Sequence, residues 1–126
     1  MKDPRDVASA LARSKFRSRF KLNAEDETYL SQRSPLIIGQ HATRIVEQRL
    51  AAARPANDGK QTPMRGHPVF VAQHATATCC RTCLRKWHGI SEGRPLSRKE
   101  IAAVVEILTV WLEARRVPPL QLNFSF

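Results

Sequence analysis

Three cysteines and three histidines lie within 22 residues of one another, between His67 and His88. Zinc in proteins prefers four tetrahedral ligands drawn from thiolate, imidazole and carboxylate groups. Cys80 and Cys83 have the C-x2-C spacing, which places two side chains on one face of a helix. A helix N-terminus also lowers the pKa of a thiol and so favours the thiolate that binds metal. The sequence therefore predicts zinc with Cys80 and Cys83 as ligands.

The remaining ligands are expected upstream of the cysteines. His88 follows Cys80 by eight residues, about 12 Å along a continuous helix, which is too far for a shared ion. His88 is better explained as a residue stabilised by the C-terminal dipole of that helix. The predicted metal site is completed from the histidines before the cysteines, and its residues are His67, His74, Cys80 and Cys83.

Other interpretations of the cysteines remain open at this stage. Cys79 and Cys83 form an alternative pair at helical spacing. Cys80, Cys83, Leu84 and Trp87 also follow the spacing of a buried helical stripe, and free cysteine is commonly buried. A thioredoxin-like redox pair is disfavoured because no βαβ pattern surrounds the motif. A cysteine nucleophile assisted by a histidine and an asparagine is compatible with the residues, but nothing selects it.

A long segment without periodicity precedes this region. Residues 55–68 contain three prolines and two glycines, and loops of this length in compact domains are usually functional or disordered. Lys60 and Arg65 lie beside Gly59 and Gly66, which allow a ligand to approach the backbone closely. The loop is a candidate phosphate-binding segment, and an ordinary solvated loop is the alternative.

The charge of the chain is strongly positive. The net charge is +10, and residues 1–21 contain seven basic and two acidic side chains. This balance is typical of proteins that bind nucleic acid or another polyanion, although solubility alone can explain it. The cations predicted to meet phosphates are Lys60, Arg65, Arg81, Arg85 and Lys86.

Helix caps and apolar periodicity predict a mainly α fold of four to five helices. Helix starts are expected at Pro4 (capped by Asp3), Ala24 (capped by Asn23), Pro35 (capped by Ser34), Cys79 (capped by Thr78) and the Ser97–Glu100 capping box. The helix that begins at Pro35 is expected to end at Arg54, and the helix that begins at Cys79 is expected to end at His88. One short β pair is expected from residues 69–72 and the alternating segment 120–126, which makes α+β the alternative class. The predicted organisation is an N-terminal basic arm or helix (1–15), a single globular domain (16–116) and a C-terminal tail (117–126) that docks as a strand.

The sequence NDGKQTPMRGHPVFVAQHATATCC, followed by CLRKWHGI, resembles a small bacterial family catalogued as domain of unknown function 4186. The resemblance extends from about Phe16 to Leu112 and is most specific over residues 57–90. No established activity, cofactor or partner comes with it, so it implies a single bacterial, cytoplasmic domain and assigns no catalytic residue.

The odd number of cysteines excludes a disulfide framework, and no apolar run is long enough to span a membrane, so a cytoplasmic protein is expected. The leading functional hypothesis is a small zinc-binding domain with a basic face for nucleic acid or another polyanion. One alternative is a small enzyme with its site in loop 57–67 over the cysteine helix. The other is a partner-binding protein, for example a homodimer, that uses the C-terminal strand.

Overall fold

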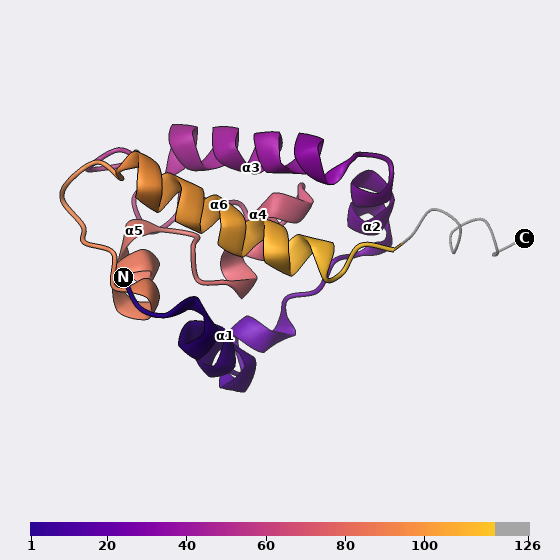
Figure 1. Ribbon diagram of the computed structural model, residues 1–126, viewed down its shortest axis with the longest axis horizontal. Coiled ribbons are helices and arrows are strands. Elements are labelled where there is room, and N and C mark those ends of the chain that lie inside the picture. The colour runs from indigo at the N-terminus through magenta and orange to yellow at the C-terminus, as the bar shows by residue number, and fades with distance from the viewer. Residues whose placement is uncertain (118–126) are drawn as a thin grey trace, which may run out of the picture.

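The computed structural model describes residues 1–117 (Figure 1). These residues form six α-helices, one 3-10 turn and one π-helical turn, and they contain no strand. The elements are α1 (Pro4–Arg13), the 3-10 turn η1 (Arg17–Arg19), α2 (Ala24–Ser31), α3 (Pro35–Arg49), α4 (Pro68–Ala75), α5 (Arg81–Cys83), the π turn η2 (Leu84–His88) and α6 (Arg98–Glu113). The mainly α class is confirmed, with more helices than the four to five expected.

Local capping chemistry sets the start of four helices as the sequence predicts. The Asp3 and Ser34 side chains accept hydrogen bonds from backbone N–H groups in the first turns of α1 and α3. Asn23 and Ser97 form capping boxes that open α2 and α6. Each cap satisfies an N–H group that has no partner within its helix, and this explains why these boundaries can be read from a few residues.

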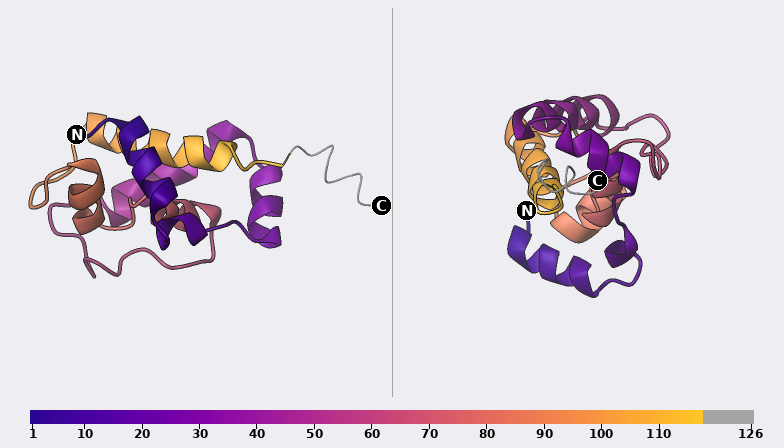
Figure 2. Two further views of the ribbon diagram at one scale, coloured as in Figure 1. Left: turned by 90° about the horizontal axis from the view of Figure 1, so that it is seen from below. Right: turned by 90° about the vertical axis from the view of Figure 1, so that its right-hand side faces the viewer.

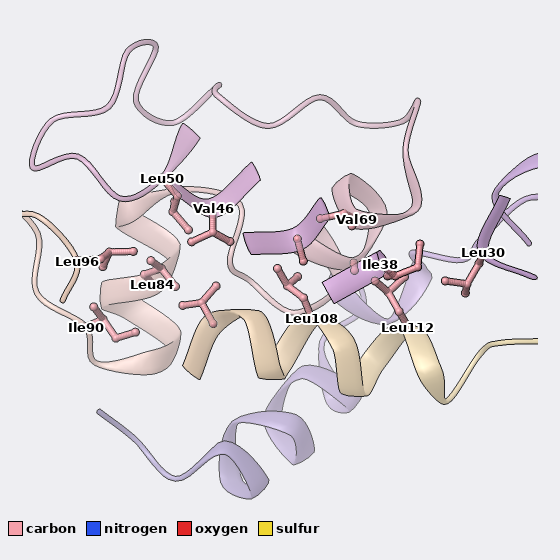
Figure 3. Packing of buried hydrophobic residues seen from close by; sticks show 13 residues of the cluster. Leu30, Ile38, Val46, Leu50, Val69, Leu84, Ile90, Leu96, Leu108 and Leu112 are labelled. Atoms are coloured by element: carbon pink, nitrogen blue, oxygen red, sulfur yellow. The ribbon is translucent and has the colours of Figure 1, made fainter. Parts of the chain in front are cut away.

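The main core lies between α3 and α6, which run side by side in opposite directions (Figure 1). Their facing side chains meet residues of α2, α4 and η2 from the sides (Figure 3). Figure 3 labels ten of these buried side chains: Leu30, Ile38, Val46, Leu50, Val69, Leu84, Ile90, Leu96, Leu108 and Leu112. The α3–α6 pair is therefore the scaffold on which the remaining elements are placed.

Helix α3 ends earlier than expected. The sequence predicts that it runs to Arg54, but its last residue is Arg49. The carbonyl oxygens of Leu50 and Ala52 instead accept hydrogen bonds from the Arg81 guanidinium, at 3.4 and 2.7 Å. A distant cation thus satisfies carbonyl groups that a longer helix would have used itself.

The strand predicted at residues 69–72 is wrong, because these residues belong to α4. His67 caps this helix and Pro68 occupies its first position, where the missing N–H group of proline costs nothing. Helix α4 is buried on nearly all sides, and an apolar run of this length does not distinguish a buried helix from a buried strand. The other half of the expected β pair, residues 120–126, lies outside the described residues.

The cysteine helix is also organised differently from the prediction. Thr78 does not cap it; Cys80 does, with its Sγ atom accepting from the Cys83 N–H group at 3.4 Å. After Cys83 the backbone changes from α to π geometry, and it ends in the left-handed region at Gly89 as expected. A single π turn inside a helix often marks a functional site.

A smaller apolar cluster joins α1 to the cysteine turn. Val7, Leu11 and Ala77 form this cluster, and Cys83 and Trp87 pack against it. The backbone N–H group of Lys2 also donates to the carbonyl of His88, at 2.7 Å. The N-terminal segment is thereby held against η2. No helix among residues 1–117 has both the length and the apolar character needed to cross a bilayer.

Candidate metal centre at the cysteine turn

The three cysteines converge on one point where the turn after α4 enters α5. Their Sγ atoms all lie within 4.8 Å of one another, and those of Cys79 and Cys83 are 3.6 Å apart. Cys79 and Cys80 are buried and Cys83 is partly exposed. The predicted pair Cys80 and Cys83 is brought together, and Cys79 joins it. This thiol cluster, Cys79, Cys80 and Cys83, could hold a metal ion.

Arg17 is the cation of the thiol cluster, and it is not among the site residues predicted from the sequence. Its Nη2 atom lies 3.1 Å from the Cys83 sulfur, and its Nη1 atom lies 3.5 Å from the Cys79 sulfur. The Nη1 atom also donates to the carbonyl of His74, at 2.8 Å. In the sequence, Arg17 is one of several alternating basic residues, so only the tertiary structure distinguishes it from its neighbours.

The hydrogen bonds within the cluster separate the acidities of the thiols. The hydrogen bond between the Cys79 and Cys83 thiols, together with Arg17, lowers the pKa of Cys79 to about 7 despite burial. The same hydrogen bond and burial raise the pKa of Cys83. Burial raises the pKa of Cys80. Cys79 is therefore the thiol that ionises first.

A polar shell fixes the backbone that carries the cysteines. Ala77, fully buried, adopts the left-handed region with φ of 57°, and the chain turns there from α4 toward α5. The Thr62 hydroxyl donates to the Cys79 carbonyl at 2.6 Å, and the Gln73 amide donates to the Thr78 carbonyl at 3.2 Å. The loop before α4 thus reaches the cysteine turn through Thr62.

The two predicted histidine ligands lie apart from the thiols. His74 stacks on Phe20, and its Nε2 atom lies 3.2 Å from the carbonyl oxygens of both Thr62 and Pro63. Among residues 1–117, the ligand atoms grouped with the three sulfur atoms include no histidine, aspartate or glutamate. His74, the nearer of the two to the cysteines in sequence, therefore contacts backbone carbonyl groups and helps to hold the loop before α4.

His67 belongs to a second group, which we name the histidine cluster: His67, His41, Tyr29 and Phe70. The ring centroid of His67 lies 4.9 Å from that of Tyr29 and 5.7 Å from that of His41. Its Nδ1 atom accepts from the Val69 N–H group at 3.0 Å, which caps α4. Burial, together with the nearby His41 and Arg33, lowers the pKa of His67 to about 4.

One of the predicted phosphate-binding cations, Arg81, is not available to a ligand. Its side chain is 1% exposed. Its two terminal nitrogens donate to the carbonyl oxygens of Leu50, Ala52, Ser91 and Arg94. Arg81 therefore joins the end of α3 to the segment before α6, and this corrects its expected role as a surface cation.

The other four predicted cations are exposed. Arg85 is paired with Glu92, its Nε atom 2.5 Å from the carboxylate oxygen. Among the described residues, no ion pair involves Lys60, Arg65 or Lys86. These three side chains are the members of the predicted set that are exposed and form no ion pair within residues 1–117.

Comparison with known proteins adds one finding. The family model described as "Domain of unknown function (DUF4186)" matches residues 5–113, which include the thiol cluster, Arg17 and all but the first residue of α1. No solved structure matches the chain.

Proposed function

We propose that Cys79, Cys80 and Cys83 bind a zinc ion as thiolates. The chain that contains them belongs to the family described as domain of unknown function DUF4186. The observation that carries this proposal is the approach of three Sγ atoms to within 4.8 Å. Three sulfur donors form a soft ligand set, which selects zinc or a similar metal over magnesium or calcium.

The distances within the thiol cluster fit this metal. Two sulfur atoms bound to one tetrahedral zinc, each at about 2.3 Å, are about 3.8 Å apart. The separation of the Cys79 and Cys83 sulfurs is 3.6 Å, so these two need little movement to share an ion. The Cys83 N–H group already points at the Cys80 sulfur, and a hydrogen bond of this kind favours the thiolate form.

Charge balance also supports zinc. Three thiolates and one divalent zinc leave a single negative charge, which would be costly in a partly buried site without compensation. The Arg17 guanidinium lies against two of the three sulfurs and supplies one positive charge. Arg17 would therefore neutralise the loaded site and hold Cys79 and Cys83 in place.

The ligand count favours a second candidate, a small enzyme. Three protein ligands leave one tetrahedral position for water or a substrate, which is the arrangement of many catalytic zinc sites. The loop that contains Thr62 and Pro63 packs against the cysteine turn through His74 and the Cys79 carbonyl. An occupied fourth position supplied by a further side chain would instead favour a structural metal.

Binding of nucleic acid remains part of the proposal as a property of the surface. Lys60, Arg65 and Lys86 are exposed, and the net charge is +10. Such a surface attracts polyanions through release of their counterions, so the affinity should fall steeply with salt.

Elemental analysis of the untagged full-length chain tests the zinc site. We expect one zinc per chain, and we expect Cys79→Ser, Cys80→Ser and Cys83→Ser each to lose most of it. Thr82→Ser is the matched control, because Thr82 lies between two of the proposed ligands but contributes no sulfur. Cobalt-loaded protein should show thiolate-to-metal charge-transfer absorption in the near ultraviolet, which reports sulfur ligation independently of activity.

The zinc proposal is overturned if chains purified in the presence of zinc contain none, remain folded by circular dichroism, and react with a thiol reagent at all three cysteines. A chain that binds zinc with its thiols still freely reactive would contradict these ligands, although it would leave metal binding itself intact.

A further inference from the structure

An apolar groove runs between α1 and α6 on the side of α6 that faces away from α3. The space has a volume of about 610 Å³, within the range of ordinary ligand pockets. Its apolar walls include Val7 and Leu11 of α1, and Ile107, Val110 and Trp111 of α6. Figure 2 shows α1 and α3 on opposite sides of α6, so the groove is separate from the main core.

Helix α6 consequently has two apolar faces. Val104, Leu108 and Leu112 are buried in the main core. Ile107 and Val110 face the groove, and Val110 is 64% exposed. A surface helix normally buries one apolar stripe and presents polar residues on its other side. The second face of α6 therefore calls for a covering element that residues 1–117 do not supply.

We propose that residues 118–126 of the same chain occupy this groove as an extended segment. Leu120, Leu122, Phe124 and Phe126 alternate with the polar residues Gln121, Asn123 and Ser125. In an extended chain, alternate side chains point to opposite sides. The four apolar side chains would enter the groove and the polar ones would face solvent, which suits a groove open along one side.

The place where the described chain ends supports this occupant. Arg116 is held by the carbonyl oxygens of Leu30 and Arg33 and by the Glu113 carboxylate. The described chain therefore ends close to the groove wall formed by Ala114 and Arg115. From Ala114 back to Ala103 the groove follows α6 for about 16 Å, and seven extended residues span about 23 Å. The segment is therefore long enough to cover the whole groove.

The groove also borders the thiol cluster. Arg17 lines the groove and contacts the sulfurs of Cys79 and Cys83. The inference does not depend on zinc, because it rests on the apolar face of α6 and on the pattern of residues 120–126.

The test uses full-length chains with charges on one side of the segment or the other. Leu122→Asp combined with Phe124→Asp should lower the Tm by about 5 °C or more, because the apolar contacts are lost. Gln121→Asp combined with Asn123→Asp adds the same charge to the polar side, and it should change the Tm by less than about 2 °C. In a Trp87→Phe background, only the first pair should increase quenching of Trp111 fluorescence by acrylamide.

A second substitution locates the contact. Val110→Asp should lower the Tm of the wild-type chain, but it should have little further effect on the Leu122→Asp, Phe124→Asp chain. Leu36→Asp is the control, because Leu36 is 70% exposed on α3 and should behave alike in both backgrounds. Equal effects of the two charge pairs on the Tm and on Trp111 would overturn the proposal. The proposal would also be overturned if the wild-type chain sediments as a dimer and only Leu122→Asp combined with Phe124→Asp dissociates it. The segment would then occupy the groove of a second copy.

Discussion

The thiol cluster and the histidine cluster come from the same short stretch of sequence, but they form two different environments. The thiols meet around a cation, Arg17, and one of them has its pKa lowered to about 7. His67 packs among aromatic rings, and burial keeps it neutral. Helix α4 separates the two, because His67 caps its first turn and the cysteines follow its last. Closeness in sequence therefore did not imply a shared site.

The largest expected effect concerns the support beneath the thiols. Replacing Arg81 with Leu removes a buried cation and leaves four carbonyl oxygens without a donor. We expect a loss of about 3–5 kcal/mol in the free energy of unfolding, measured by urea denaturation. Arg85→Leu is the control; its ion pair with Glu92 is at the surface, and its loss should cost at most about 1 kcal/mol. Similar losses for both variants would show that Arg81 is not the anchor of α5.

The metal content of histidine variants tests the separation of the two clusters directly. His67→Asn and His74→Gln should each keep one zinc per chain, since neither ring belongs to the group of ligand atoms around the sulfurs. The Cys83→Ser chain should lose most of its zinc under the same conditions. A folded His74→Gln chain that loses zinc would show that His74 leaves the Thr62 and Pro63 carbonyls to become the fourth ligand.

The pH dependence of alkylation probes the thiol cluster without metal. The pKa of Cys79 is lowered to about 7, so its thiolate is present above that pH, where an ordinary cysteine is still protonated. The rate of modification of Cys79 by iodoacetamide in zinc-free protein should therefore rise with a midpoint near pH 7. Arg17→Gln should move the midpoint upward, whereas Arg19→Gln, an exposed change in the same turn, should not. An unchanged midpoint in Arg17→Gln would remove Arg17 from this role.

His67 should make stability sensitive to acid by a smaller amount. Its pKa is about 4 when folded and 6.5 as an ordinary value, so the unfolded chain binds the extra proton. Stability should then fall as the pH drops from about 6.5 to 4, by an amount on the order of 1 kcal/mol after screening by solvent. His67→Asn keeps a good helix cap but cannot titrate, so its stability should depend less on pH in that window. Parallel curves for the two proteins would contradict this assignment.

The smallest effect on folding is expected in the loop that precedes α4. Lys60→Ala combined with Arg65→Ala should change stability by no more than about 0.5 kcal/mol per site, since both side chains are exposed. If the loop contacts phosphates, the pair should weaken binding to a labelled oligonucleotide and reduce its salt dependence. Arg98→Ala combined with Lys99→Ala removes the same charge elsewhere. Equal losses from both pairs would mean that net charge alone drives the binding.

Short-range chemistry explains which parts of the fold could be predicted. The starts of α1, α2, α3 and α6 were correct because a cap and the N–H groups that it binds lie within four residues of each other. The helix at residues 68–75 was predicted as a strand, because burial on nearly every side removes the periodicity that separates the two structures. The early end of α3 was missed for a different reason, which is that its carbonyl partners come from Arg81.

The sequence by itself singled out the C-x2-C pair Cys80 and Cys83, offered Cys79 as an alternative partner of Cys83, and placed all three in a strongly basic chain. Only the tertiary structure decided which residues meet there. Arg17 reaches sulfurs that are 62 and 66 residues away in the chain, and His67 is directed to Tyr29 and His41. Local spacing fixes which side chains share a turn or a face of a helix. Contacts between distant segments depend on how α1, α4 and α5 pack together, and no local pattern records that.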